Sequence, residues 1–203
     1  MLSTLRPATV LFAGMTLLCG VVYPLVVTGI GQLVFSKEVA GSLIERNGKP
    51  VGSRLIGQSF SAPGYFWGRP SATGPMPDNA ANSSGANQGP TNPALLDAVK
   101  TRIAALKAAD SGNTLPVPVD LVTASASGLD PEISLAAAQY QVNRIAAARH
   151  LPAQKVRALI DQHGRASVFG LFGEPAVNVL ELNLALDDIT GPLAIAAKPA
   201  HTD

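Results

Sequence analysis

The sequence predicts an α+β protein in which one N-terminal transmembrane helix is followed by a single mixed domain with a small sheet and several helices. Three observations carry this prediction: an uncharged apolar run near the N-terminus, an Asn-Gly turn between two strand-like segments, and apolar helical periodicities that begin at Asn or Asp. The chain has 203 residues. About 165 of them follow the apolar run, which is enough for one ordinary domain with its own core.

The apolar run extends from Pro7 to Ser36 and contains no Asp, Glu, Lys, Arg or His. About 20 apolar residues suffice to cross a bilayer as a helix, so this run has a turn or two to spare. A cleaved signal peptide has a shorter apolar region that ends at a small-residue cleavage site. Because Lys37 and Glu38 follow the run without such a site, the sequence predicts an uncleaved signal anchor.

Small, hydroxyl and amide residues recur at four-residue intervals along this predicted helix. Small residues let two membrane helices approach closely, and hydroxyl or amide groups hydrogen bond across such contacts. Pro24 also leaves a carbonyl without its N–H donor and is expected to kink the helix near its middle. The pattern favours a face that packs on another membrane helix; the alternative is a chance spacing, because such patterns are common in membrane segments. The residues of this face, called the small-residue ridge, are Thr16, Gly20, Pro24, Thr28 and Gln32.

Charge and cysteine usage exclude some functions but leave the orientation open. The net charge is +1 with no long run of either sign, which argues against a nucleic-acid surface. The one cysteine, Cys19, lies within the apolar run, so the chain cannot form an internal disulfide. Arg6 precedes the run, whereas Lys37, Arg46, Lys49 and Arg54 follow it. A simple positive-inside count would place the domain in the cytoplasm, but the rule weakens for long soluble domains.

The region from Ser61 to Pro93 is rich in Gly, Pro, Asn and Ser, as a flexible linker would be. It also contains Tyr65, Phe66 and Trp67, including the only tryptophan of the chain. Disordered linkers are poor in aromatic residues. We therefore expect an ordered loop that is pinned by an aromatic cluster.

The remaining elements are predicted from turn, cap and periodicity signals. In chain order they are a hairpin over Ser42–Ile56 with its turn at Asn47-Gly48, a helix from Asn92-Pro93 to about Ala109, a short strand over Asp120–Thr123, a helix from Asp130-Pro131 to about Arg149, a helix from Leu151-Pro152 to Gly164, a strand over Ala166–Phe172, and a final helix capped by Asn178 that continues to Leu186.

Few residues suggest a catalytic, nucleotide-binding or metal-binding site. Ser125 and Ser127 precede Asp130, and His163 lies farther along, which invites a Ser-His-Asp hypothesis. The G-x-S-x-G elbow that would make this specific is missing, and capping of the helix predicted at Pro131 explains Ser127 and Asp130 more simply. The sequence contains no G-x-x-x-x-G-K-[ST] loop. The three histidines are far from each other and from carboxylate pairs, so no metal site is predicted.

Polar residues on two predicted helices are more informative. Gln141, Asn143 and Arg144 lie on an alanine-rich helix, where a solvated face is the favoured interpretation from the residues alone. Asn183 lies among leucines on a helix that is apolar almost all round, and such a helix should be buried. A buried amide must be hydrogen bonded, so Asn183 is expected to bond either within the domain or to a partner.

A series of short motifs follows one order along the chain. They are Arg69-Pro70-Ser71, Gly89-Pro90-Thr91-Asn92, Pro116-Val117-Pro118 with Asp120 to Ser125, Gly128-Leu129-Asp130-Pro131 with Ile133-Ser134, Gln141-Val142 with Arg144-Ile145-Ala146, and Gly173-Glu174-Pro175 with Val177 to Leu180, Leu182 and Asn183. Together they resemble the C subunit of the bacterial Kdp high-affinity potassium-transporting ATPase, from the anchor to about Leu186. Ala126 and Ala176 stand where this family usually has Gly and Arg, and the tail after Asp188 looks like an extension outside the family pattern.

The resemblance implies a non-catalytic subunit of an ATP-driven potassium uptake complex in the bacterial inner membrane, which supports assembly and regulation of the pump. It implies three partners: a channel-like potassium-translocating subunit, a P-type ATP-hydrolysing subunit and a small single-helix subunit. It also implies a catalytic chaperone role that raises the affinity for ATP, so ATP is the one cofactor to consider. The family's soluble domain lies outside the membrane, however, whereas ATP is cytoplasmic. The resemblance marks as partner-binding or structural residues Arg69, Asp120, Asp130, Gln141, Arg144, Glu174, Asn178 and Asn183.

The predicted organisation is therefore a short cytoplasmic N-terminus, a membrane helix, an extracytoplasmic domain that includes the Gly/Pro/Asn/Ser-rich loop, and a loose tail. Their respective ranges are 1–6, 7–36, 37–188 with the loop at 61–93, and 189–203. Two alternatives remain from the residues alone. One is a membrane-anchored periplasmic serine hydrolase that uses Ser125 or Ser127, and the other is a nucleotide-binding regulator whose domain lies inside the cell.

Overall fold

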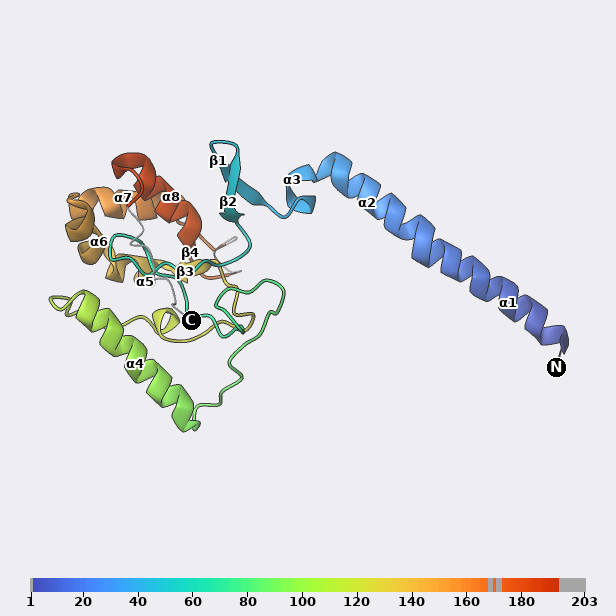
Figure 1. The fold of residues 1–203 in the computed structure, drawn as a ribbon, viewed down its shortest axis with the longest axis horizontal. Coiled ribbons are helices and arrows are strands. Elements are labelled where there is room, and N and C mark those ends of the chain that lie inside the picture. Colours follow the sequence, from blue (N-terminus) through green and yellow to red (C-terminus); the bar gives the residue numbers. More distant parts are fainter. Residues whose placement is uncertain (1, 168–169, 171–172, 194–203) are drawn as a thin grey trace, which may run out of the picture. The chain divides into compact units, whose positions relative to one another are not determined.

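The computed structural model describes residues 2–167, 170 and 173–193 (Figure 1). It divides into an N-terminal unit, Met1–Pro50, and a C-terminal unit, Val51–Asp203. An apolar helix is followed by short strands and further helices, so the predicted mixed α+β class is confirmed.

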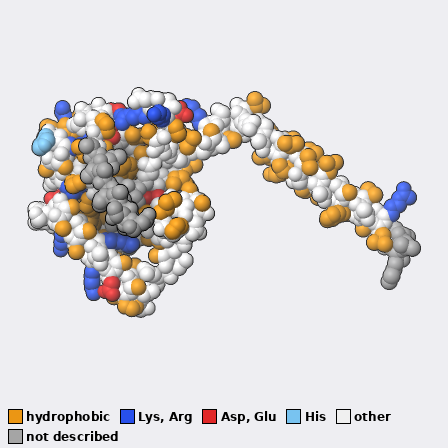
Figure 2. All heavy atoms as spheres, in the orientation of Figure 1, with side chains coloured by type: hydrophobic (Ala, Val, Ile, Leu, Met, Phe, Trp, Pro, Cys, Tyr) orange, Lys and Arg blue, Asp and Glu red, His pale blue; other side chains and the backbone are white. Residues whose placement is uncertain are grey.

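The N-terminal unit is dominated by one continuous helix. It consists of α1 (Leu2–Leu17), a π-helical turn η1 (Leu18–Val22) and α2 (Tyr23–Val34). The stretch Thr4–Val34 has 31 residues, and an 18-residue window within it has a mean hydropathy of 2.3, which makes it long and apolar enough to cross a membrane. Figure 2 shows hydrophobic side chains along this helix and no charged side chain on its visible face between the two ends.

The π-helical turn lies directly before Pro24 and has a simple cause. Pro24 has no N–H to give to the carbonyl of Gly20, four residues earlier. The backbone forms a wider turn instead, in which the N–H of Tyr23 donates to the carbonyl of Leu18, five residues earlier. The effect of Pro24 that the structure records is therefore a change of hydrogen-bond register.

Beyond the long helix, the chain forms a one-turn helix α3 (Ser36–Val39) and the strands β1 (Leu43–Arg46) and β2 (Lys49–Ser53). The two strands form a two-stranded sheet, which confirms the predicted hairpin. Asn47 and Gly48 have φ values of 53° and 72°. Two successive positive φ values are the geometry that makes Asn-Gly the favoured two-residue hairpin turn.

The C-terminal unit contains helices that gather around a very short sheet (Figure 1). Its elements are α4 (Pro93–Ala109), a 3₁₀ turn η2 (Val119–Leu121), β3 (Glu132–Ser134), α5 (Leu135–Tyr140), α6 (Val142–Arg149), α7 (Ala153–His163), β4 (Ala176–Asn178) and α8 (Val179–Thr190). The predicted helices at α4, α7 and α8 are confirmed. The side chains of Asn92 and Asn178 cap α4 and α8 by accepting from the N–H groups of Ala94 and Glu181.

The core lies where the helices cover the sheet. Strands β3 and β4 pair antiparallel with Ile133 opposite Val177, and Arg165 adds a single bridge to Ala176 on the other side. Helix α7 contacts α5, α6, α8 and β4, which makes it the central helix of the unit. The fully buried apolar side chains include Phe66, Ile133, Val142, Ile145, Val156, Ile160, Val177, Leu182 and Leu186.

Two sequence predictions were wrong in the middle of this unit. The strand expected over Asp120–Thr123 is instead largely the 3₁₀ turn η2. The helix expected from Asp130-Pro131 begins at Leu135, where Ser134 caps it, because residues 132–134 pair with β4. The strand expected over Ala166–Phe172 lies partly outside the described residues, since 168–169 and 171–172 are not described, and so do residues 194–203 of the expected tail.

The loop between the hairpin and α4 is ordered by its aromatic residues, as expected. No helix or strand occurs in Ser61–Thr91, but Phe66 is completely buried and Tyr65 is 8% exposed. Trp67 packs against the core, and Phe60 lies 5.5 Å from Tyr65 between ring centroids. The loop is therefore part of the folded unit.

Candidate functional site

The aromatic part of the loop, residues 63–67, forms a strap that is held by two side-chain amides. Asn183 on α8 accepts a hydrogen bond from the Phe66 N–H at 2.8 Å and donates to the Phe66 carbonyl at 3.0 Å. Gln141, between α5 and α6, accepts from the Trp67 N–H at 2.8 Å and donates to the Trp67 carbonyl at 3.1 Å. Each amide thus bonds both backbone groups of one residue, as a neighbouring strand would.

Arg144 on α6 holds the same strap from a second direction. Its guanidinium lies over the Trp67 ring, with Cζ 4.3 Å from the ring centroid, and donates to Gln141 Oε1 at 2.6 Å and to the Pro63 carbonyl. Burial lowers the pKa of Arg144 to about 10, against a smaller opposing effect of the Asp110 carboxylate. The side chain therefore remains a cation at neutral pH and makes a cation–π contact with Trp67.

Arg149, at the end of α6, completes the set of contacts to the strap. Its side chain is fully buried and forms an ion pair of 2.8 Å with Asp187 on α8. It also donates to the Gly64 carbonyl at 2.6 Å and lies over the Tyr65 ring, 4.6 Å from Cζ to the centroid. Neither Arg149 nor Asp187 was among the site residues predicted from the sequence. The available signal was helical spacing, because Arg149 lies seven residues after Val142, on the face that Val142 buries.

These contacts test the predictions that were made for the polar residues Gln141, Asn143, Arg144 and Asn183. A solvated face was the wrong interpretation for Gln141 and Arg144, which are 1% and 6% exposed. It holds only for Asn143, which is exposed. The prediction that Asn183 is buried and hydrogen bonded is confirmed, and its partner is the strap of the same unit. Without these amides, the backbone N–H and carbonyl groups of Phe66 and Trp67 would lack these hydrogen bonds. This need explains why polar side chains lie in the buried part of the unit.

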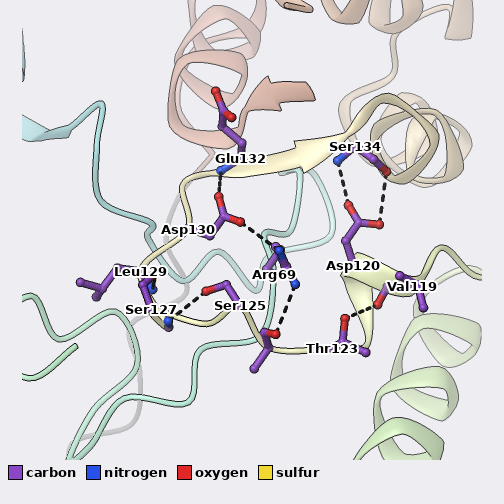
Figure 3. A network of polar contacts seen from close by, with 12 residues as sticks. Arg69, Val119, Asp120, Thr123, Ser125, Ser127, Leu129, Asp130, Glu132 and Ser134 are labelled. Atoms are coloured by element: carbon purple, nitrogen blue, oxygen red, sulfur yellow. Dashed lines mark hydrogen bonds and ion pairs between the residues drawn. The ribbon is translucent and has the colours of Figure 1, made fainter. Parts of the chain in front are cut away.

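A second polar network follows the strap along the chain (Figure 3). Arg69 forms an ion pair with Asp130 at 3.0 Å and donates to the Ala124 carbonyl at 3.2 Å. The other Asp130 oxygen accepts from the Glu132 N–H at 3.0 Å. The Arg69 Nε atom is buried and has no partner among the described residues. Arg69 therefore connects the loop to the turn that leads into β3.

Asp120 accepts hydrogen bonds from the other end of the same strand, β3. It accepts from the Ser134 N–H at 2.7 Å and from the Ser134 hydroxyl at 3.2 Å (Figure 3). The Ser134 oxygen in turn accepts from Ala137 N–H at the start of α5. Asp130 and Asp120 thus occupy the N–H groups of Glu132 and Ser134 at the edge of β3 that does not pair with β4. Unpaired strand edges are open to pairing with other chains, so these carboxylates protect this edge.

The serines of this region close turns. Ser125 Oγ accepts from the Gly128 N–H at 2.9 Å, and Ser127 Oγ accepts from the Leu129 N–H at 3.1 Å. The prediction that Ser127 and Asp130 cap a helix at Pro131 was wrong, because β3 follows the turn and the helix starts later. In the described ranges neither serine hydrogen bonds to a histidine, which removes the geometric support for a Ser-His-Asp site.

A cavity of about 450 Å³ opens beside this network. Its charged lining comprises Arg69, Asp120, Asp130, Glu132, Arg165 and Glu174. Among the described residues, no group of three or more His, Cys, Asp or Glu is arranged to hold a metal ion. Glu174 is exposed at this cavity, whereas Asn178 is used internally, donating to the Arg54 carbonyl at 2.8 Å while capping α8.

Comparison with known proteins identifies the family. A family model described as "KdpC: K+-transporting ATPase, c chain" matches residues 5–188. The "Potassium-transporting ATPase KdpC subunit" of Herminiimonas arsenicoxydans is 71% identical over 187 residues, covering 92% of this chain and 98% of that protein. The chain belongs to the KdpC family. The KdpC subunits of Ralstonia nicotianae and Dechloromonas aromatica are 65% and 62% identical, covering 91% and 94% of this chain and 91% and 100% of their own lengths.

Membership of the KdpC family confirms the resemblance drawn from the motifs. The protein is a membrane-associated subunit of the K+-transporting ATPase, with one candidate membrane-spanning helix in the part of the chain that the structure describes. The family match ends at Asp188, so the remaining C-terminal residues lie beyond it. Of the eight residues that the KdpC motifs marked, seven hydrogen bond within the C-terminal unit, and Glu174 is exposed at the cavity.

Proposed function

We propose that this chain is a non-catalytic accessory subunit that assembles the K+-transporting ATPase through its membrane helix and holds its C-terminal unit outside the cytoplasm. Its partners would be the channel-like translocating subunit, the P-type ATP-hydrolysing subunit and the small single-helix subunit. Packing against the translocating subunit would fix the arrangement of the complex. Regulation of ATP affinity would then act through the contacts between subunits.

The alignment of the small-residue ridge carries this proposal. In a regular α-helix of 3.6 residues per turn, Thr16 and Thr28 would lie about 120° apart around the axis. The π-helical turn between them absorbs one additional residue, which reduces the separation to about 20°. The turn imposed by Pro24 therefore brings both threonines and Gly20 close to one face. A single face of small and hydroxyl residues is what close packing of two membrane helices requires.

Gly20 provides the test of this face. A Cβ atom at Gly20 would meet nothing within 4 Å in the chain itself, so a larger residue there disturbs no internal contact. We expect Gly20→Leu to reduce the yield of complex that co-purifies in detergent by about tenfold, corresponding to a loss of about 1.4 kcal/mol in association. The physical reason is steric separation of the two helices along the whole ridge.

Gly14→Leu is the matched control, because it adds the same side chain about 200° from Thr16 on the same helix. Gly14 also has nothing within 4 Å of its Cβ position. The control should co-purify as the unmodified chain does. Equal yields for the two variants would show that the ridge is ordinary lipid-facing sequence.

The orientation is tested by labelling. Ser111 is exposed and lies in the turn after α4. In a Cys19→Ala background, Ser111→Cys is expected to react with a membrane-impermeant maleimide on intact spheroplasts, because a domain of this length escapes the positive-inside rule. Reaction only after lysis would place the unit in the cytoplasm and favour the nucleotide-binding alternative.

If the subunit is non-catalytic, replacing Ser125 or Ser127 should have only a small effect. Ser125→Ala and Ser127→Ala each remove one side-chain acceptor from a turn N–H, so we expect a loss of about 0.5–2 kcal/mol in unfolding free energy. Potassium transport by the assembled complex should persist in both. Loss of transport in an intact complex of unchanged thermal stability would require a catalytic role for that serine.

A further inference from the structure

The one-turn helix α3 is fixed against the end of the membrane helix. A Cβ atom placed on Gly31 would lie 3.1 Å from Val39 Cγ2, so the Val39 side chain packs on the last turn of α2. The N–H of Phe35 donates to the Gly31 carbonyl at 2.8 Å, and the N–H of Val39 donates to the Phe35 carbonyl at 2.9 Å. Helix α3 therefore lies at the depth of the final turn of α2.

The length of the helix sets that depth in a bilayer. From Arg6 to Val34 the helix rises about 42 Å at 1.5 Å per residue. A bilayer measures about 40–45 Å when its headgroup regions are included. With Arg6 at one headgroup region, Val34 reaches the other, and α3 lies there with it. Tilt shortens the projected length and draws α3 further into the membrane.

The surface of α3 matches this position. Phe35 and Val39 are 55% and 51% exposed, and Lys37 between them is exposed. Large apolar side chains beside a lysine are typical of segments that lie in the membrane interface, where the apolar groups enter the acyl boundary and the ammonium reaches the headgroups.

We propose that residues 35–39 form a phospholipid-binding site, in which Lys37 donates hydrogen bonds to a headgroup phosphate while Phe35 and Val39 enter the acyl boundary. Within residues 35–50 three cations (Lys37, Arg46 and Lys49) accompany two carboxylates (Glu38 and Glu45), so the local net charge is small. The site therefore recognises the phosphate that all glycerophospholipids share and does not require anionic lipid. None of residues 35–39 belongs to the small-residue ridge, and the inference does not depend on the proposed function.

The test uses the full chain in phospholipid bilayers, with and without phosphatidylglycerol added to phosphatidylcholine. With lysine labelled by ¹³C at Cε, solid-state NMR should detect dephasing of a lysine signal by lipid ³¹P in both bilayers. Lys37→Gln should abolish this dephasing, whereas Lys107→Gln, an equal charge loss at an exposed position of α4, should retain it. Dephasing that survives Lys37→Gln, or that is missing without phosphatidylglycerol, would overturn the proposal.

A depth measurement provides the second readout. In a Cys19→Ala background, a spin label at Phe35→Cys should be more accessible to oxygen, and less accessible to a water-soluble nickel complex, than a label at Ser111→Cys. Phe35 suits this purpose because its side chain is exposed. Equal accessibility at the two positions would place α3 in water and refute the lipid site.

Discussion

Replacing Asn183 with leucine is expected to lower the free energy of unfolding of the C-terminal unit by about 2–5 kcal/mol. Asn183 is 1% exposed and bonds both the N–H and the carbonyl of Phe66. Leucine has the same branched arrangement of side-chain heavy atoms but no hydrogen-bonding group, so both backbone groups would be buried without a partner. Each such group costs about 1–3 kcal/mol, and the added apolar contact of leucine offsets a part of that loss.

The measurement is denaturant unfolding of the full chain in detergent, followed by Trp67 fluorescence because Trp67 adjoins the affected residue. Asn82→Leu is the matched control. Asn82 donates to the Gly74 carbonyl at 3.0 Å on the exposed surface, where water can replace the bond. We expect a change within about 0.5 kcal/mol for the control. A loss of similar size in both variants would mean that the amide contacts of the strap are not what stabilises it.

Elements with strong local signals were predicted correctly from the sequence. Asn92 before Pro93 marks the start of α4, and Asn178 marks the start of α8, because an Asn side chain satisfies helix N–H groups through contacts only a few residues away. The turn at Asn47-Gly48 is equally local. Such signals depend on no distant part of the chain.

Elements that depend on distant contacts were missed. Asp130-Pro131 has the same appearance as Asn92-Pro93, but it leads into β3, whose partner β4 lies more than forty residues later. Residues 132–134 take strand geometry because pairing with β4 overrides the local helix signal. The π-helical turn is an intermediate case. Pro24 predicts that the regular α-helical hydrogen bonding is interrupted, but it does not predict which backbone hydrogen bonds form instead.

The polar residues of the site illustrate the same limit. Gln141 bonds to Trp67 across 74 positions of sequence, and Asn183 bonds to Phe66 across 117. Asn183 was predicted to be buried because it lies among leucines, a local pattern. Gln141 lies beside alanines and Arg144, which fit a solvated face equally well until the strap is in place.

The strap couples the two polar networks of the C-terminal unit. Trp67 is held by Gln141 and Arg144, and Arg69, two residues later, bonds to Asp130 in the second network. The short peptide from Trp67 to Arg69 therefore connects the two networks, so that fixing the position of one constrains the position of the other. The contacts of Arg149 at the opposite end of the strap should matter for the same reason.

Arg149→Met is expected to destabilise the C-terminal unit by about 3–5 kcal/mol, because it leaves the Asp187 carboxylate buried without its cation. The Arg149 side chain is fully buried and that of Asp187 is 9% exposed, so water screens this pair little. The variant also loses the donor to the Gly64 carbonyl and the cation over Tyr65. Chemical unfolding of the full chain measures the loss.

The double variant Arg149→Met with Asp187→Leu separates the two contributions. Removal of both charges eliminates the carboxylate that has lost its cation, and apolar replacement of a buried pair is often close to neutral. We therefore expect the double variant to recover part of the stability that Arg149→Met loses, and the unrecovered part to represent the other contacts of the two side chains, with the strap and with Thr190 and Gly191. Arg157→Met, on the exposed face of α7, is the matched control and should change stability by no more than about 0.5 kcal/mol. A double variant that is less stable than Arg149→Met alone would show that Asp187 stabilises the unit independently of Arg149, through its bond with the Tyr65 hydroxyl at 3.1 Å.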